Sequence, residues 1–133
     1  MTHRILVVED QEDNKQILRD LLGSVGIELV EADNGQAAIE MAEAHKPDLI
    51  LMDIQLPVMD GYEATRRIKA IPALKSIPII VVTSYALSGD ETKARAAGCD
   101  AYVTKPYSPR QLLAAIRRFL PQDSGPAPGK AAP

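Results

Sequence analysis

Acidic residues follow two of the most hydrophobic runs in the sequence. Glu9 and Asp10 come directly after residues 5–8, and Asp53 comes directly after residues 49–52. Three carboxylates brought together in a partly desolvated cleft repel one another unless a cation is supplied. Mg²⁺ meets that need, because it takes oxygen ligands, requires few carboxylates and keeps waters that a phosphate can replace. The pattern therefore indicates a magnesium site, provided that the two runs lie side by side.

Two further polar residues follow hydrophobic segments later in the chain. Thr83 comes after residues 79–82, and Lys105 ends the segment 101–105. The lysine supplies a second positive charge, and the threonine supplies a hydroxyl donor. A carboxylate nucleophile, a metal, a lysine and a hydroxyl are together the parts needed to receive a phosphoryl group. That transfer depends mostly on positioning and on neutralising the charge of the phosphoryl oxygens.

The hydrophobic pattern predicts five strands. The runs 5–8, 49–52 and 79–82 are almost purely aliphatic, which is typical of parallel strands covered on both faces. Two segments, 27–31 and 101–105, mix polar residues into the strand pattern. We expect these two at the edges of the sheet.

Helical patterns alternate with the predicted strands. A stripe of apolar residues at helical spacing runs from Ile17 to Val25 and ends at Gly26, a helix-stop signal. Further helices are expected at about 35–45, from near Asp60 to before Pro72, at about 90–97, and over a second apolar stripe in residues 112–120. The helix at 90–97 offers only alanines to the core, so we expect it to be the least firmly anchored.

This alternation of strands and helices predicts an α/β fold, with a parallel sheet, right-handed crossovers and helices on both faces. With the polar segments at the edges, the natural strand order is 2-1-3-4-5, counted along the chain. That is the order of flavodoxin-like doubly wound folds. Ligands bind such a sheet at the carboxyl ends of the strands, at the switch point between strands 1 and 3. The acidic residues, the threonine and the lysine should therefore meet at one rim.

Composition narrows the class of protein. The chain has 133 residues, of which 46% are hydrophobic and 25% charged, as in an ordinary single globular domain. The net charge of −3 argues against direct nucleic-acid binding. The single cysteine, Cys99, cannot form an intramolecular disulfide, and no apolar run approaches the ~20 residues of a membrane helix. We expect a cytoplasmic protein without membrane insertion.

The last residues differ in composition from the rest. Residues 121–133 are rich in proline, glycine and alanine and contain no large apolar side chain. Such a segment cannot pack a core. We therefore expect a domain at 1–120 and a disordered tail at 121–133.

Four segments resemble the receiver domains of two-component response regulators. They are VVEDQEDN, DLILMDIQLPVMDGYEATRRIK, PIIVVTS and YVTKPYS, and the match covers residues 4 to about 120. Within the family, the stretch GDETKARAAGCDAYVTKP is most similar to stand-alone receivers of cell-cycle phosphorelays in alphaproteobacteria. The alternative is an excised receiver domain of a hybrid histidine kinase or of a larger response regulator.

The resemblance implies a role for each residue that takes part in phosphoryl transfer. Asp53 would be the phosphoacceptor, and Lys105 would contact both its carboxylate and the phosphoryl group. Thr83 would be the switch hydroxyl that shifts toward the phosphoryl oxygens. Tyr102 would then turn inward into the vacated space.

The resemblance also implies a metal site and its surroundings. The Mg²⁺ ligands would be Glu9, Asp10, Asp53 and the backbone carbonyl of Gln55. Many relatives carry two aspartates where this chain has glutamate and aspartate, which leaves metal binding intact in principle. Gln55 and Tyr85 would tune water access, and a cis peptide bond would join Lys105 to Pro106.

The implied function is a phosphorylation-dependent signalling switch rather than an ordinary enzyme. Its only reactions would be transfer from a phosphohistidine to its own aspartate and slow hydrolysis of the resulting acyl phosphate. The donor would be a sensor histidine kinase or a histidine phosphotransfer protein, docked on the first helix around Asn14 and Ile17. Phosphorylation would change the surface formed by residues 90–97, 101–105 and 112–120. A downstream protein target would recognise that surface, with the domain acting as a monomer or a phosphorylation-linked dimer.

Other interpretations compete with this one. A flavin-binding electron carrier would need a Ser/Thr/Gly-rich phosphate loop, whereas residues 9–13 are acidic apart from one glutamine. A haloacid-dehalogenase-like phosphatase would want a second aspartate where this chain has Gln55, and a degenerate receiver would act only as a binding module. Taken singly, Asp10 or Asp13 could cap the first helix. Turn and cap chemistry is expected of Asp60 and Gly61.

Overall fold

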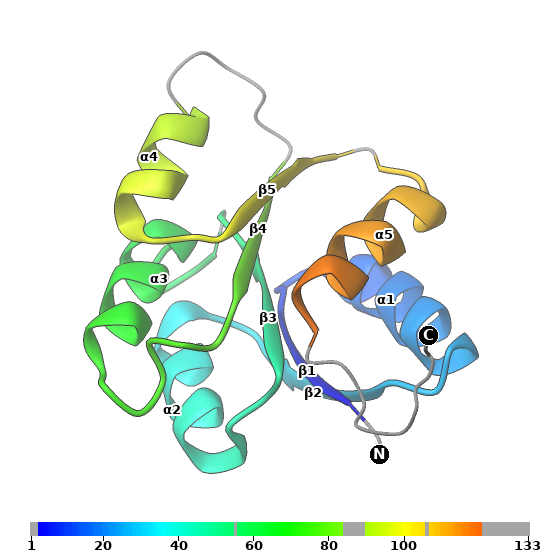
Figure 1. The fold of residues 1–133 in the computed structure, drawn as a ribbon, viewed down its shortest axis with the longest axis horizontal. Helices are drawn as coiled ribbons and strands as arrows, with labels where there is room; N and C mark the ends of the chain where they lie inside the picture. The colour runs from blue at the N-terminus through cyan, green and yellow to red at the C-terminus, as the bar shows by residue number, and fades with distance from the viewer. Residues whose placement is uncertain (1–2, 55, 84–89, 106, 121–133) are drawn as a thin grey trace.

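The computed structural model describes residues 3–54, 56–83, 90–105 and 107–120. Within these residues, five parallel strands form one sheet in the order β2-β1-β3-β4-β5, and five helices connect them (Figure 1). The predicted fold class and strand order are confirmed. The elements are β1 (Arg4–Val8), α1 (Glu12–Ser24), β2 (Glu28–Ala32), α2 (Gly35–His45), β3 (Leu49–Asp53), α3 (Gly61–Ala70), β4 (Ile79–Thr83), α4 (Asp90–Ala97), β5 (Ala101–Thr104) and α5 (Pro109–Phe119).

Several strand ends differ from the sequence prediction by one residue. Asp53 and Thr83 are the last residues of β3 and β4 rather than the first residues beyond them, and β5 ends at Thr104. The acceptor candidate therefore still takes part in the sheet, where Asp53 is the parallel partner of Val82. A side chain on a strand has its direction fixed by the pleat, so its orientation is set more firmly than that of a loop residue.

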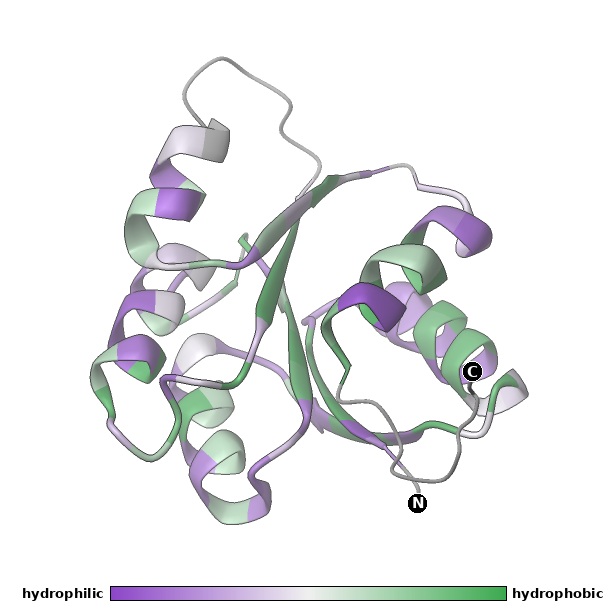
Figure 2. Cartoon of the chain, in the orientation of Figure 1, coloured by the Kyte–Doolittle hydropathy of each residue, from purple (hydrophilic) through white to green (hydrophobic). Residues whose placement is uncertain are grey.

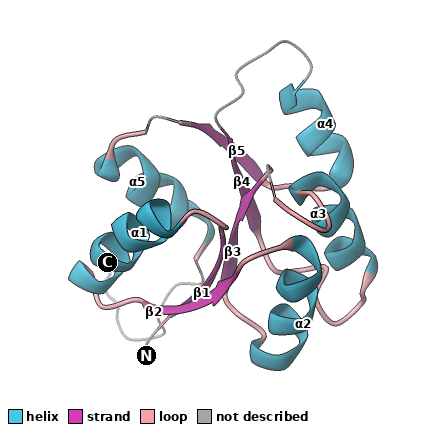
Figure 3. Ribbon diagram, turned by 180° about the vertical axis from the view of Figure 1, so that it is seen from behind, coloured by secondary structure: helices cyan, strands magenta, loops and turns pink. Residues whose placement is uncertain are grey.

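The helices divide unequally over the two faces of the sheet. α1 and α5 cover one face, and α2, α3 and α4 cover the other (Figures 1 and 3). Hydrophobic residues fill the central strands and the inward sides of most helices (Figure 2). On the face with three helices, the buried side chains that the structure describes in α4 are Ala94 and Ala97. The expectation that this helix offers only alanines to the core holds for its described side chains.

The apolar stripe of α1 is wider than the surface that buries it. Leu18 and Leu22 are buried, whereas Ile17 is 53% exposed and Val25 is 37% exposed. Two residues of the predicted apolar stripe therefore lie outside the core. Helical periodicity identifies the apolar side of a helix, but not how much of that side the rest of the fold covers.

The helix caps decide two of the interpretations left open by the sequence. Gln11 is the N-cap of α1 and makes no side-chain cap hydrogen bond, so neither Asp10 nor Asp13 caps this helix. Asp60 does cap α3, since its Oδ1 accepts a hydrogen bond from the backbone N–H of Glu63 at 2.9 Å. The expected cap chemistry at Asp60 is therefore present.

A lysine ties three segments together at the amino edge of the sheet. Lys69 on α3 donates from Nζ to the carbonyls of Lys75 and Ile77 and to Asp100 Oδ2, at 3.1, 2.8 and 2.9 Å. The same Asp100 oxygen accepts a hydrogen bond from the backbone N–H of Ile79 at 2.9 Å. These bonds fix the chain between α4 and β5. The carboxyl end of α4 is thus tied to the body of the domain.

Thr65 carries a hydroxyl that costs stability. The residue lies on α3 and is fully buried, yet its Oγ1 has no hydrogen-bond partner among the described residues. A buried hydroxyl without a partner costs about 1–3 kcal/mol. We predict that Thr65→Val raises the free energy of unfolding by about 1 kcal/mol in urea denaturation. Thr92→Val on the exposed side of α4 should change it by less than about 0.5 kcal/mol. A less stable Thr65→Val variant would show that the hydroxyl is satisfied.

Candidate functional site

Three carboxylates meet where β1 and β3 end. The two strands are neighbours, and Val8 is the parallel partner of Met52, so the residues that follow them lie side by side. Glu9, Asp10 and Asp53 each place a carboxylate oxygen within 4.8 Å of the other two. Glu9 and Asp53 are buried, at 3% and 7% exposure, and Asp10 is exposed. We call this group the acid pocket.

Lys105 brings a positive charge to the acid pocket from the far side of β4. Its Nζ lies 3.2 Å from Glu9 Oε1 and 3.6 Å from Asp53 Oδ2. Its backbone N–H donates to the carbonyl of Thr83 at 2.7 Å, which fixes the residue just beyond β5. Burial alone would lower the pKa of Lys105, but the charges of Asp53 and Glu9 and the hydrogen bond to Glu9 outweigh it. The pKa is therefore raised, and the side chain is a cation at neutral pH.

Glu9 is held in place by three contacts. Its Oε1 accepts from Lys105, its Oε2 accepts from the backbone N–H of Gln11 at 3.1 Å, and its own N–H donates to the carbonyl of Ala32 at 3.0 Å. A glutamate is one methylene longer than an aspartate. Here that length lets one carboxylate join the lysine to the amide that starts α1.

The segment after Asp53 folds back against the strand that it leaves. Gly61 donates from its backbone N–H to the carbonyl of Ile54 at 3.0 Å. A Cβ on Gly61 would lie 2.1 Å from the carbonyl oxygen of Asp53, and one on Gly35 would lie 2.4 Å from that of Met59. Contacts this close exclude any side chain at these two positions. The glycines therefore let the backbone close over the end of β3.

Thr83 shares the carboxyl edge of the sheet with Asp53 but lies on its other face. Asp53 is the parallel partner of Val82, which belongs to the core under α1 and α5. Side chains alternate along a strand, so Thr83 lies on the same side as Val81, in the core under α2, α3 and α4. Tyr102 is the partner of Val81 and packs on that core. Thr83 and Tyr102 thus occupy the face that includes α4.

Tyr107 belongs to the site and was missed by the sequence analysis. It is half-buried and lines a small pocket together with Glu9, Asp53 and Lys105, above an apolar floor that includes Leu18. Burial raises the pKa of Tyr107, and the charges of Glu9 and Asp53 act in the same direction against that of Lys105. The phenol is therefore neutral at physiological pH. The feature of the sequence that could have identified Tyr107 as a site residue is its position two residues after Lys105.

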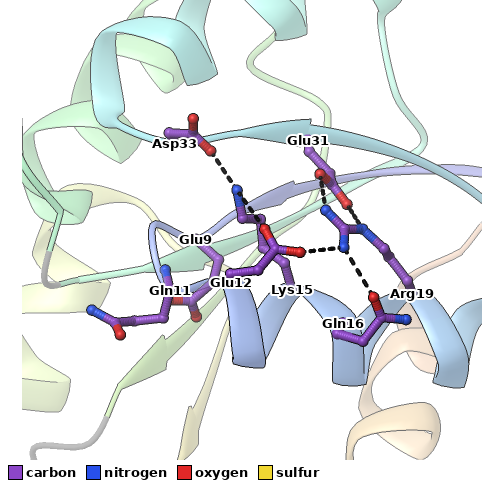
Figure 4. A network of polar contacts seen from close by, with 8 residues as sticks. All are labelled: Glu9, Gln11, Glu12, Lys15, Gln16, Arg19, Glu31 and Asp33. Atoms are coloured by element: carbon purple, nitrogen blue, oxygen red, sulfur yellow. Dashed lines mark hydrogen bonds and ion pairs between the residues drawn. The ribbon is translucent and has the colours of Figure 1, made fainter.

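A network of ion pairs holds the start of α1 against β2 (Figure 4). Arg19 binds both Glu31 on β2 and Glu12 on its own helix, and Lys15 binds Asp33 at 2.8 Å. The side chain of Glu12 also lies 3.6 Å from Lys15. Although Glu12 is close in sequence to the acid pocket, its carboxylate serves the surface of α1. The network positions the helix that begins at Glu12, shortly after Glu9 and Asp10.

Some residues to which the sequence analysis gave roles lie outside the described part of the chain. They are Gln55, Tyr85 and Pro106, and with them the carbonyl ligand, the residues expected to tune water access and the expected cis peptide bond. The expected tail at 121–133 also lies outside the described residues.

Comparison with known proteins identifies the family. The model of the response regulator receiver domain matches residues 5–117. The chain belongs to the response regulator receiver family. It is 42% identical over 120 residues to the polar-differentiation response regulator DivK of Brucella anthropi, and the match covers 90% of this chain and 98% of that protein. DivK of Brucella ovis matches with the same identity and coverage.

Solved receiver structures have the same fold. The receiver domain of sensor histidine kinase PA1611 from Pseudomonas aeruginosa, with a magnesium ion coordinated in its active site cleft, superposes with a TM-score of 0.84 at 37% identity. That match covers 90% of this chain and 98% of the other. Chemotaxis protein CheY4 of Vibrio cholerae superposes at 0.85 with 27% identity, over 90% and 100% of the two chains.

As a receiver, the protein is a phosphorylation-dependent signalling switch. The match to almost the full length of the DivK proteins favours the single-domain type of response regulator over a receiver taken from a hybrid kinase. The predicted similarity to receivers of alphaproteobacterial cell-cycle phosphorelays is confirmed by the match to DivK. None of the helices in the described part of the chain has the length and hydrophobicity needed to span a membrane.

Lys105 compensates two buried carboxylates, so its removal should be costly. Its side chain is 19% exposed, against 4% for Glu9 and 8% for Asp53. Removing one partner of a buried pair leaves an uncompensated charge, so we predict that Lys105→Met lowers the free energy of unfolding by about 3 kcal/mol at pH 7. Urea denaturation at pH 7 measures it. Lys75→Met, at an exposed position, is the control, and an equal effect in both variants would contradict the prediction.

Proposed function

We propose that Asp53 accepts a phosphoryl group from a phosphohistidine and that the resulting acyl phosphate is the active state of the protein. One observation carries the proposal. A buried carboxylate at the end of a central strand lies 3.6 Å from a lysine ammonium and within 4.8 Å of two further carboxylates. This is an acceptor beside its counter-charge and beside ligands for a divalent cation.

The residues of the acid pocket fit Mg²⁺. We propose Glu9, Asp10 and Asp53 as its side-chain ligands and the backbone carbonyl of Gln55 as a fourth. All are hard oxygen donors, and the mutual distances of the three carboxylate oxygens allow one ion to reach them after small adjustments. The related receiver domain of PA1611 holds magnesium in its active site cleft. When bound, the ion supplies positive charge that offsets the charge on the phosphoryl oxygens.

The transfer itself requires little chemistry from the protein. A carboxylate oxygen of Asp53 attacks phosphorus, the P–O bond forms as the P–N bond of the phosphohistidine breaks, and the imidazole leaves with the electron pair. Lys105 already contacts this carboxylate and can extend to the arriving phosphoryl oxygens. Hydrolysis reverses the modification when water attacks phosphorus and the carboxylate leaves. We propose that Gln55 and Tyr85 set the access of that water, and that the protein acts on no other substrate.

The new charge acts through Thr83 and Tyr102. A phosphoryl group adds charge and strong acceptor oxygens at one point, so local donors must respond. Thr83 is the last residue of β4 and lies on the face that includes α4, where Tyr102 packs on the same core. A shift of the hydroxyl toward the phosphoryl oxygens frees space for the tyrosine ring. We propose that α4, anchored at its carboxyl end near Asp100, then changes its position.

The proposed partners follow from these surfaces. A sensor histidine kinase or a histidine phosphotransfer protein docks on α1, where Asn14 is half-buried and Ile17 is 53% exposed. A downstream protein recognises the surface of α4, β5 and α5, and the domain at 1–120 works as a monomer or as a phosphorylation-linked dimer. We place the protein in the cytoplasm, with residues 121–133 as a tail that takes no part in the switch.

Substitution of the acceptor tests the proposal. Asp53→Asn removes the nucleophilic carboxylate and should abolish Mg²⁺-dependent labelling by acetyl phosphate, as read by mass spectrometry of the intact protein. Asp60→Asn is the matched control, because asparagine caps a helix as well as aspartate does and Asp60 caps α3. It should be labelled like the natural protein. Labelling retained by Asp53→Asn would refute the assignment.

Metal binding can be measured without any phosphodonor. A ligand that binds only the folded state raises stability by about 1.4 kcal/mol at ten times its dissociation constant. Mg²⁺ should therefore raise the thermal midpoint of the natural protein, and Asp10→Asn should remove most of that shift. Asp13→Asn makes the same change in the first turn of α1, at a residue that does not belong to the acid pocket. This variant should keep the shift in thermal midpoint. An Asp10→Asn variant that responds to Mg²⁺ like the natural protein would place the ion elsewhere.

A further inference from the structure

Val58 has a backbone conformation that a valine rarely adopts. Its φ is +69°, and the carbonyl of Pro57 accepts a hydrogen bond from the N–H of Met59 at 2.7 Å, which makes Val58 the centre of a γ-turn. A β-branched residue in the left-handed region is strained, and glycine or asparagine would adopt the same conformation at lower cost. The turn therefore lowers the stability of the domain as long as a valine occupies it.

The side chain of Val58 gains nothing from the fold in return. It is 84% exposed, the highest value among the large hydrophobic residues that are exposed in the described part of the chain. The next are Ile17, at 53%, and Val25, at 37%. An apolar side chain that is both exposed and strained contributes nothing to the core. Strain of this kind is concentrated at functional sites.

The segment that carries Val58 is fixed next to Asp53. The N–H of Gly61 binds the carbonyl of Ile54, and the carbonyl of Met59 accepts a hydrogen bond from the N–H of Gly35 at 3.2 Å. The segment therefore lies toward α2 and α3, whereas Ile17 on α1 lies on the opposite face of the sheet (Figure 1). The two most exposed large hydrophobic residues of the described chain thus lie toward opposite faces of the sheet, Val58 in the segment after Asp53 and Ile17 on the helix that follows Asp10.

We propose that Val58 is a specificity-determining contact for the phosphodonor. In the docked complex it meets an apolar side chain of the phosphohistidine-bearing protein, while Ile17 contacts that protein from α1, on the other face of the sheet. The inference rests on the proposed function, in which Asp53 receives the phosphoryl group.

The geometry of the reaction favours a phosphodonor as the occupant. Reacting atoms must approach to about 3–3.5 Å, and Asp53 is only 7% exposed. A protein that brings a histidine to this aspartate must therefore press against the segments that border it. Neither a downstream protein bound at α4, β5 and α5 nor a second copy of the chain has to reach Asp53.

The test compares two donors on the same variants. Val58→Asn keeps the turn and removes the apolar contact, and Val58→Ile keeps both the apolar contact and the strain. A panel of autophosphorylated histidine kinases, labelled with ³²P on the phosphohistidine, is screened first, and the kinase that transfers fastest to the natural protein is the probe. Acetyl phosphate is the small donor, which needs no docking. Val25→Asn makes the same chemical change at the C-cap of α1, at the opposite end of the helix from the acid pocket.

Val58→Asn should slow transfer from the kinase about tenfold, as the loss of one good interface contact does, with acetyl phosphate labelling unchanged. Its thermal midpoint should rise by roughly 3 °C as the strain is relieved. Val58→Ile and Val25→Asn should accept from the kinase at the natural rate.

Three results would overturn the inference while leaving the proposed function intact. They are an unchanged kinase rate in Val58→Asn, equal slowing with both donors, and a midpoint that does not rise. A natural protein that neither donor labels would instead refute the proposed function, and the inference with it.

Discussion

The ammonium group of Lys105 lies between two buried carboxylates, 3.2 Å from Glu9 and 3.6 Å from Asp53. Without that cation, two like charges would stand side by side in a partly desolvated pocket, which is unfavourable. With it, the pocket still carries more negative than positive charge, because the three carboxylates of Glu9, Asp10 and Asp53 outnumber the one ammonium group. This imbalance makes the site receptive to a divalent cation. It also makes the site sensitive to further charge on Asp53.

The strand order brings the charges together. β1 lies beside β3, so Glu9 and Asp53 become neighbours although 44 positions separate them in the sequence. Lys105 arrives from β5 across β4, and its amide is bonded to the carbonyl of Thr83. The acceptor, the lysine and the switch candidate are therefore linked through three adjacent strands. A change at Asp53 has a short path to the face that includes α4.

The sequence was sufficient for the fold because the signals for it are local. The polarity of residues 27–31 and 101–105 placed two strands at the edges, and the observed sheet has them there. The residues of the acid pocket could likewise be predicted from the sequence, because each follows a hydrophobic run. Their assigned roles remain proposals that rest on the family resemblance and on the geometry.

Features that depend on contacts between residues far apart in the sequence could not be predicted from it. The bond between Lys69 and Asp100 joins residues 31 positions apart and leaves no local pattern. The left-handed backbone of Val58 is unexpected for valine. Tyr107 was overlooked because its place in the pocket depends on the fold, which brings it beside Glu9 and Asp53. The N-cap of α1, Gln11, makes no side-chain cap hydrogen bond, so the alternative interpretation of Asp10 or Asp13 as a cap is not met.

The most direct test of the account is to locate the phosphoryl group chemically. The protein is incubated with acetyl phosphate and Mg²⁺, the acyl phosphate is reduced with borohydride, and the modified residue is identified by peptide mass spectrometry. The account predicts one modified position, Asp53, and no modification when Mg²⁺ is omitted. Modification at Glu9 or Asp10 in place of Asp53 would contradict the claim that the buried carboxylate beside Lys105 is the acceptor.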